Sequence, residues 1–395
     1  MVITGLDRIV EDVQLQQQFP GKVALLGHNA SLDRRGKHAA LLFRQIFGDR
    51  LVKLFGPQHG FATSDQDNMI ETDHFIHPFF RIPVYSLYSE TRVPTDAMLE
   101  GIDHLFVDLQ DIGSRMYTYL YTLTLLLEKC AGKDLEVIVL DRPNPINGLM
   151  VEGPVLDLKY ASFIGRHPLP VRHGLTLGEL AVLHQNHWTP EPAQMSILTM
   201  QGWHRAMNFS NTGLPWALPS PNIARPETAL IFPGTVHFEG TQLSEGRGTT
   251  QPFEVFGHPR IEPFRHVKHL EQVLHASGLG GVTMRPISFL PTFHKHANTL
   301  CGGYQVHVTD RANFRPWRTG MILIREMYHL LEGDFQWLEP PYEYVHDRMP
   351  IDILSGTHGI RHWVESLDGL DVLNDLEDLD EFLTLRKEVL LYAED

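Results

Sequence analysis

The sequence predicts an α/β protein with a Rossmann-like, doubly wound and mostly parallel sheet, followed by a smaller C-terminal α/β (α+β) domain. Three observations lead to this prediction. Short apolar runs, typical of strands buried on both faces, alternate with helical patterns from Lys22 to Arg142. Loops rich in polar residues, glycine and proline follow these runs. A second, shorter series of strand and helix patterns follows residue 255.

The N-terminal half alternates strand and helix patterns in chain order. The last expected helix is apolar on nearly every side, so we expect it to be buried. The expected strands are 22–28, 51–55, 82–88, 104–109 and 136–142, and the expected helices are 38–47, 95–101 and 115–131.

The C-terminal half contains fewer and longer elements. A helix is expected at Thr176–His184, with Thr176 as its N-cap and Glu179 closing a capping box. The remaining expected elements are helices at 262–276, 317–331 and 372–392 and strands at 282–289 and 303–309. Because a glycine-rich polar loop at 238–254 separates the two series, we divide the chain into domains 1–240 and 241–395.

The composition excludes some classes of function. The net charge is -15 and basic residues are scattered, which argues against a nucleic-acid surface. No run reaches the roughly 18 apolar residues of a transmembrane helix, and the N-terminus lacks a signal-peptide pattern. We therefore expect a cytoplasmic protein. Of its two cysteines, Cys130 lies in an apolar helical pattern and is expected to be a buried free thiol.

The loops that follow the expected strands are candidates for a ligand site, because ligands of open α/β sheets bind at the carboxyl ends of the strands. They read GHNAS, GPQHG, SLYSETR, DLQDIGSR and DRPNPINGL. Neither GxGxxG nor GxxxxGK[ST] occurs, so dinucleotide binding and P-loop chemistry are poorly supported.

Several carboxyl groups stand in or near these loops, and glycoside hydrolysis commonly uses a pair of them. For each one taken alone, capping a helix or binding loop N–H groups is the better interpretation, whereas several at one sheet edge favour at least one functional acid. The candidates are Glu90, Asp108, Asp111, Asp141, Glu239 and Glu245.

Basic and neutral polar side chains accompany the acids. An arginine could hold a substrate carboxylate through two hydrogen bonds, although for Arg115 and Arg142 a structural ion pair is at least as good an interpretation. The histidine pairs of HQNH and HKH lack a third ligand at a persuasive spacing, so no metal is predicted. The substrate-binding candidates are Asn29, Tyr85, Arg92, Arg115, Arg142, Asn144, Glu245 and Arg247.

These segments, taken together and in order, resemble the NamZ family of exo-β-N-acetylmuramidases, formerly a domain of unknown function. The resemblance extends over nearly the whole chain. It rests on LFGPQHG, IPVYSLY, DLQDIGSRMYTY, VLDRPNPINGL, VEGP, SFIGRHPLPVRHGLTLGELA, PSPNI, FPGTVHFEGTQLSEGRGTTQPFE and CGGYQVHVTD.

The resemblance implies a Rossmann-like domain joined to a smaller one, with the active site in the cleft between them. The implied activity is release of N-acetylmuramic acid (MurNAc) from the non-reducing end of peptidoglycan fragments, without a cofactor. The lactyl carboxylate of this sugar suits Arg247 or Arg92, and its hydroxyls suit Asn144 or Tyr85. A cytoplasmic member would act on recycled fragments.

One position departs from the family pattern, GPEHG, whose glutamate is the implied catalytic acid. Here the residue is Gln58, and an amide has no ionisable proton to donate. The substitution is compatible with an impaired homologue that only binds amino sugars, with an engineered change, or with another acid such as Asp111, Glu90 or Glu239. We expect Asp111 and Glu239 to carry the carboxyl chemistry beside Gln58, with His59 positioning substrate or tuning a neighbour. A metal-dependent hydrolase using the histidines is a further alternative.

Overall fold

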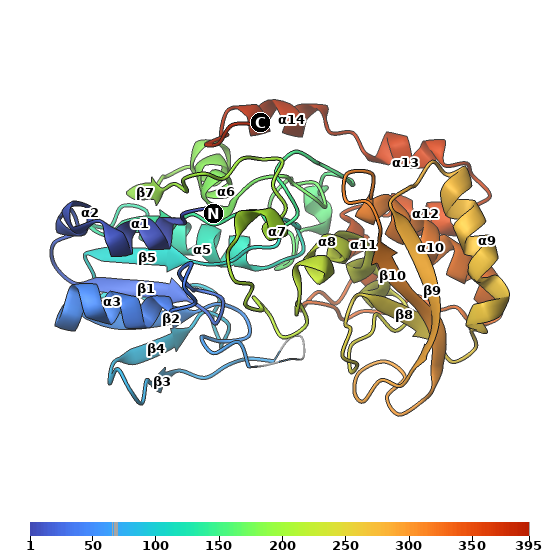
Figure 1. The fold of residues 1–395 in the computed structure, drawn as a ribbon, viewed down its shortest axis with the longest axis horizontal. Helices are drawn as coiled ribbons and strands as arrows, with labels where there is room; N and C mark the ends of the chain where they lie inside the picture. Colours follow the sequence, from blue (N-terminus) through green and yellow to red (C-terminus); the bar gives the residue numbers. More distant parts are fainter. Residues whose placement is uncertain (65, 67–69, 395) are drawn as a thin grey trace.

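The chain forms two lobes that lie side by side (Figure 1). The computed structural model describes residues 1–64, 66 and 70–394. A seven-stranded sheet lies in the N-terminal lobe and a three-stranded antiparallel sheet in the C-terminal lobe. The predicted fold class is therefore confirmed, whereas the domain boundary near residue 240 stays a prediction.

The larger sheet has the order β3-β4-β2-β1-β5-β6-β7, in which every neighbouring pair except β3 and β4 is parallel. Without the edge strand β3, this is the strand order of a Rossmann fold, so the topological switch point lies between β1 and β5. The strands are β1 (Val23–Gly27), β2 (Leu51–Gly56), β3 (Phe75–Ile76), β4 (Pro83–Ser86), β5 (His104–Asp108), β6 (Glu136–Leu140) and β7 (Met195–Leu198).

Strand alternation explains why both faces of this sheet are covered. Val23 and Leu25 pack with helices on one face, whereas Ala24 and Leu26 point into the core of the other face. The first face holds α1 (Gly5–Glu11) and α3 (Ala39–Phe47), and the second holds α5 (Tyr119–Cys130) and α6 (Leu177–Leu183). The strands read as continuous apolar runs because both sets of side chains are buried.

The C-terminal lobe is built from the expected second series of elements. The strands β8 (Val255–His258), β10 (Cys301–Val308) and β9 (Val282–Phe289) pair in that order. The helices are α8 (Pro226–Thr235), α9 (Pro263–Ala276), α10 (Pro316–Leu331), α11 (Pro350–Ser355) and α12 (Gly359–Glu365). Helices α8 and α10 approach closely at Gly234 and Gly320, where a Cβ on Gly320 would lie 2.6 Å from the Gly234 carbonyl oxygen.

Two expected helices differ from the structure. The helix predicted at 115–131 begins only at Tyr119, because the Arg115 N–H bonds to the carbonyl of Val171 in an extended segment. The helix predicted at 372–392 is two helices, α13 (Asp371–Leu376) and α14 (Asp380–Lys387). Between them, Glu377 accepts hydrogen bonds from Gly153 N (2.6 Å) and Arg318 Nε (2.6 Å).

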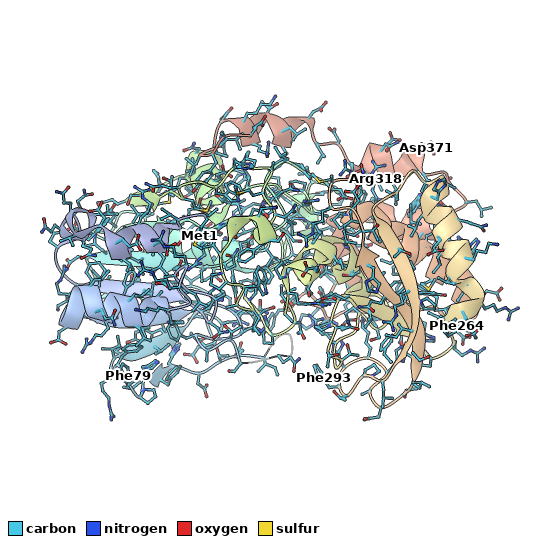
Figure 2. The ribbon with its side chains drawn as sticks, viewed as in Figure 1. Met1, Phe79, Phe264, Phe293, Arg318 and Asp371 are labelled. Atoms are coloured by element: carbon cyan, nitrogen blue, oxygen red, sulfur yellow. The ribbon has the colours of Figure 1, made fainter. Side chains whose placement is uncertain are left out.

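The chain returns from α13, at the C-terminal lobe, to α14, which lies over the N-terminal lobe (Figure 1). The Tyr392 hydroxyl donates to Asp141 Oδ2 (2.5 Å), and Leu391 N donates to Glu179 Oε1 (2.9 Å). Figure 2 shows Arg318 on the side of the C-terminal lobe that α13 covers, where its Nη2 donates to Asn374 Oδ1 (2.7 Å). The C-terminal lobe is thus connected at both ends to the N-terminal lobe.

No described helix has both the length and the apolar character that crossing a bilayer requires. Cys130 and Cys301 are free and buried, as expected for Cys130.

Candidate active site

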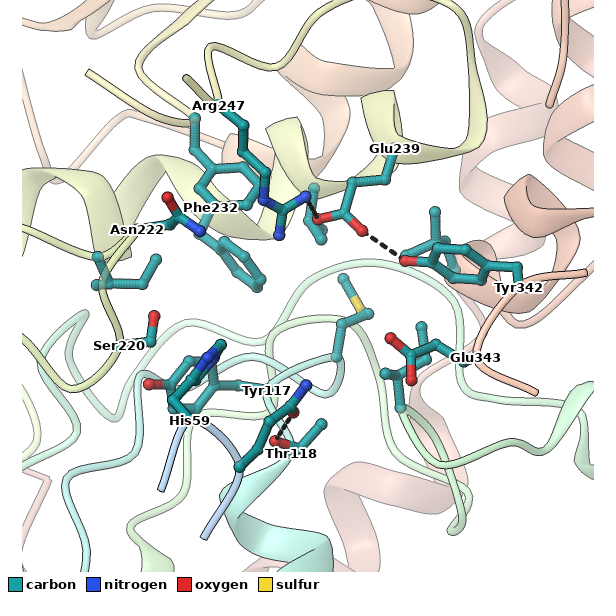
Figure 3. A pocket seen from close by; sticks show the side chains of 17 residues that line it. His59, Tyr117, Thr118, Ser220, Asn222, Phe232, Glu239, Arg247, Tyr342 and Glu343 are labelled. Atoms are coloured by element: carbon teal, nitrogen blue, oxygen red, sulfur yellow. Dashed lines mark hydrogen bonds and ion pairs between the residues drawn. The ribbon is translucent and has the colours of Figure 1, made fainter. Parts of the chain in front are cut away.

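A cavity lies between the lobes, at the carboxyl end of the larger sheet (Figure 3). The space between its lining residues is about 520 Å³, part of which is open to solvent. The lining residues are Gln58, His59, Met116, Tyr117, Thr118, Ile164, Ser220, Asn222, Ile223, Phe232, Val236, Glu239, Arg247, Phe253, Tyr342, Glu343 and Leu354.

A tight turn after β2 carries Gln58 and His59 into this cavity. Gly60 N donates to the carbonyl of Pro57 (3.0 Å), and His59 has a φ of 70°, in the left-handed region that non-glycine residues rarely adopt. Gly56 is required at the start of the turn, since a Cβ there would lie 2.4 Å from Phe61 N. A backbone held in this strained form presents two adjacent polar side chains to a ligand.

The amide of Gln58 is oriented by a neighbour. The Thr118 hydroxyl donates to Gln58 Oε1 at 2.6 Å, just before the first turn of α5. The oxygen of the amide is therefore used as an acceptor, and its nitrogen is a hydrogen-bond donor for a ligand. Position 58 contributes a donor that is neutral at every pH.

The opposite wall of the cavity comes from the C-terminal lobe. Arg247 Nη1 lies 2.6 Å from Glu239 Oε1 and 3.3 Å from Glu245 Oε1. Glu245 also accepts from Lys295 Nζ (2.9 Å), and Lys295 together with Arg247 holds the pKa of Glu245 well below its usual range, against the effect of burial. The guanidinium of buried Arg247 is thus held in place by the carboxylates of Glu239 and Glu245.

Glu239 has donors on both of its carboxylate oxygens. Besides Arg247, the Tyr342 hydroxyl donates to its Oε2 at 2.6 Å. Figure 3 shows this chain of contacts along one wall, with Ser220, His59 and Tyr117 on the far side. Such an arrangement suits a carboxylate that accepts protons or stabilises positive charge.

Glu343 is a cavity residue that our reading of the sequence missed. It is 4% exposed, and its Oε2 has no hydrogen-bond partner among the described residues. Burial, aided by the nearby charge of Glu239, raises its pKa to about 7. It lies in the segment PPYEYV, and the only sequence signal was a glutamate between two tyrosines in a loop after two prolines.

Of the residues predicted from sequence, the cavity brings together Gln58, His59, Glu239 and Arg247. Asp111 lies outside the lining, where its Oδ2 accepts from Gly113 N (2.7 Å) and its Oδ1 is buried without a partner. Burial raises the pKa of Asp111 to about 7.

The other predicted arginines lie outside the lining as well. Arg142 Nε and Nη2 bind both oxygens of Asp108, at 2.6 and 2.7 Å, which is the structural ion pair considered above. Arg115 is fully buried, and its Nη2 donates to the carbonyl of Leu354 (2.9 Å). Arg92 Nη2 donates to the hydroxyl of Tyr344 (2.8 Å).

The predicted neutral polar residues have other surroundings. Asn144 Nδ2 donates to the carbonyl of Leu175 (2.9 Å). Asn29 is exposed, and Tyr85 of β4 packs against the ring of Phe55, 5.6 Å away. These three side chains lie outside the cavity lining.

One group of potential metal ligands is found among the described residues. Glu128, His167 and His184 offer ligand atoms within 4.8 Å of one another. However, Arg166 Nη2 binds both oxygens of Glu128, at 3.2 and 3.1 Å, so the carboxylate is already neutralised. We assign no ion to this group.

Comparisons with known proteins point to the same family along nearly the whole chain. Two family models match, described as the N-terminal and C-terminal parts of exo-beta-N-acetylmuramidase NamZ, over residues 23–227 and 230–392. A peptidoglycan beta-N-acetylmuramidase NamZ of Bacillus subtilis is 38% identical over 394 residues, covering 99% of this chain and 91% of the relative.

Two solved structures of DUF1343 family proteins from Bacteroides fragilis share the fold. One superimposes with a TM-score of 0.85 at 29% identity and covers 99% of both chains. The other has a TM-score of 0.76 at 28% identity and covers 100% of both chains.

Proposed function

The chain belongs to the NamZ family of exo-β-N-acetylmuramidases, and we propose that its inter-lobe cavity releases terminal MurNAc from peptidoglycan fragments. The protein is a glycoside hydrolase. The observation that carries the proposal for the site is the meeting of Gln58 and His59 from one lobe with Glu239 and Arg247 from the other. A cytoplasmic location and action on recycled fragments stay predictions.

Binding of the sugar is assigned to groups of both lobes. The guanidinium of Arg247 is the cationic group we propose for the lactyl carboxylate, since planar guanidinium groups bind carboxylates well. Gln58, His59 and Asn222 are the polar groups we propose for the N-acetyl group and hydroxyls. The apolar side chains of Met116 and Phe232 provide a surface for the face of the ring.

Glu239 is the group we propose for the carboxylate chemistry. One of its oxygens accepts from Arg247 Nη1 and the other from the Tyr342 hydroxyl, so the carboxyl group is held in a fixed orientation in the cavity. As a carboxylate it serves as the base for the attacking water or stabilises positive charge at C1.

A second candidate function is binding of MurNAc without hydrolysis. The observation that favours it is Gln58 in the position of the family's implied acid. Hydrolysis of 4-nitrophenyl β-MurNAc should be measured for the unaltered protein and for Gln58→Glu, with binding of MurNAc measured in parallel. Turnover by the unaltered protein would support the hydrolase. Binding without turnover, with activity gained in Gln58→Glu, would support the binding protein.

A further inference from the structure

The cavity has two carboxyl groups among its described lining residues, and they differ in their contacts. Glu239 accepts from Arg247 and from the Tyr342 hydroxyl. Glu343, the next residue after that tyrosine, has an oxygen with no hydrogen-bond partner although it is buried. A pair of carboxyl groups in such different surroundings is the usual basis for dividing acid and base roles.

The backbone at Glu343 is held in an uncommon conformation. Tyr342 and Val345 exchange two hydrogen bonds of 2.9 Å, and between them Glu343 and Tyr344 have φ values of 47° and 64°. Two-residue turns with two positive φ angles usually contain asparagine, aspartate or glycine, because a side chain at such an angle is strained by about 1–3 kcal/mol. Strain of this kind is often found where a side chain must point in a set direction.

The turn is fixed from the other lobe. Arg92 donates to the Tyr344 hydroxyl (2.8 Å), and its guanidinium lies 5.1 Å from the Tyr344 ring and 4.0 Å from the Tyr88 ring. Arg92 is in turn paired with Glu71 (3.0 Å). The carboxyl group of Glu343 consequently points into the cavity between Tyr342 and Thr118 (Figure 3).

We propose that Glu343 is the general acid of this hydrolase and donates the proton that Gln58 cannot supply. The proposal rests on the proposed function. As the bond between C1 and the glycosidic oxygen breaks, the carboxyl proton of Glu343 passes to that oxygen, which leaves as a hydroxyl group. Water supplies the new hydroxyl at C1 and releases one proton, which returns through Glu239 or through solvent to Glu343 and restores its acid form.

The surroundings of Glu343 keep this proton available. Burial and the Glu239 charge raise its pKa to about 7, while Arg247 and Arg92 act in the opposite direction. The other titratable groups near the turn are Tyr88, Tyr342 and Tyr344. Burial raises the pKa of Tyr88 and of Tyr342 above the ordinary value, so these two are neutral phenols at pH 7. A large share of the molecules therefore carries the proton near neutral pH. Arg92 is a positioning residue in this scheme, because it acts through the turn.

The test compares two substrates with different leaving groups. A MurNAc–N-acetylglucosamine disaccharide needs a proton on its leaving oxygen, whereas 4-nitrophenyl β-MurNAc releases a stable anion. For Glu343→Gln we expect kcat/KM to fall about 10²–10⁴-fold on the disaccharide and far less on the nitrophenyl substrate. The loss of activity on raising the pH through about 7 should also disappear in this variant. Glu339→Gln, an exposed carboxyl in the same loop, is the matched control.

The outcomes separate this inference from the proposed function. No turnover of either substrate by the unaltered protein would refute the hydrolase itself. Unchanged disaccharide hydrolysis by Glu343→Gln would overturn the inference and direct attention to Glu239 or Glu71. An equal loss on both substrates would also overturn it, since it would indicate a role in binding. If Glu343→Gln fails to fold, Glu343→Asp should show the same dependence on the leaving group to a smaller extent.

Discussion

Replacing Asp111 by asparagine should change how the stability of the protein depends on pH. The Asp111 carboxyl is buried, and one of its oxygens has no partner. The nearest imidazole, His173, lies 3.8 Å away, and burial lowers its pKa to about 3, so it brings no countercharge at neutral pH. Ionising Asp111 in the folded state is therefore unfavourable, and its pKa is raised to about 7.

The size of the effect on the free energy of unfolding follows from the pKa shift of Asp111. The ordinary pKa is 3.8 and the folded value is about 7, which corresponds to about 4 kcal/mol at about 1.4 kcal/mol per unit. Between these two values the folded chain holds a proton that the unfolded chain has released. The contribution of Asp111 to the free energy of unfolding is thus complete below the unfolded pKa and lost as the pH rises through about 7.

Asp111→Asn removes this titration but keeps an acceptor for Gly113 N. Urea unfolding of both proteins, at pH values from about 4.5 to about 8, should show the variant gaining stability over the unaltered protein by up to about 4 kcal/mol as the pH rises. Parallel curves for the two proteins would refute the reasoning. Because Asp111 lies outside the cavity lining, we expect turnover to be retained; its loss would support the catalytic role predicted from sequence.

Three further predictions concern the C-terminal lobe and the thiols. Arg247→Ala leaves Glu239 with one donor fewer, so the free energy of unfolding in urea should fall by about 3–5 kcal/mol. The same variant should bind MurNAc more weakly, and the loss should be smaller for N-acetylglucosamine, which lacks the lactyl group. Gly320→Ala places a Cβ 2.6 Å from the Gly234 oxygen and should lower stability by about 1–3 kcal/mol in the same assay, whereas Gly333→Ala, with no atom within 4 Å of its Cβ, should have little effect. Burial raises the pKa of Cys130 to about 12 and that of Cys301 to about 11. Both thiols should therefore react with Ellman's reagent at pH 8 only after unfolding. Rapid labelling of the folded protein would contradict their burial.

The sequence predicts the elements of this fold well where apolar pattern alone decides them. The expected strand at 282–289 is β9, and the expected helix at 262–276 is α9 to within one residue. The four-residue β7 has no such signal, because it is half-buried and alternates weakly. The break inside the expected helix 372–392 was missed because Glu377, between α13 and α14, makes a tertiary contact with Gly153, and such contacts leave no local pattern.

Two parts of the site could be found from sequence: the loop that follows β2, and the glycine-rich loop that carries Glu239 and Arg247. Gln58 and His59 follow β2, and strand ends in this fold converge on the ligand. Arg142 follows β6 in the same way, yet it faces Asp108 at the end of β5, and only the pairing of those strands reveals this. Glu343 is brought to the cavity by the packing of one lobe on the other, which no spacing in the sequence records.

The return of the chain to the N-terminal lobe has a mechanical consequence. Val2 N donates to the carbonyl of Thr212 and Tyr392 binds Asp141, so both of these anchored segments belong to the N-terminal lobe. Tension applied between residues 2 and 392 would pass through that lobe alone. The C-terminal lobe would carry no load until the Tyr392 segment had detached from the N-terminal lobe. In a pulling experiment, extension of the C-terminal lobe should therefore follow this detachment.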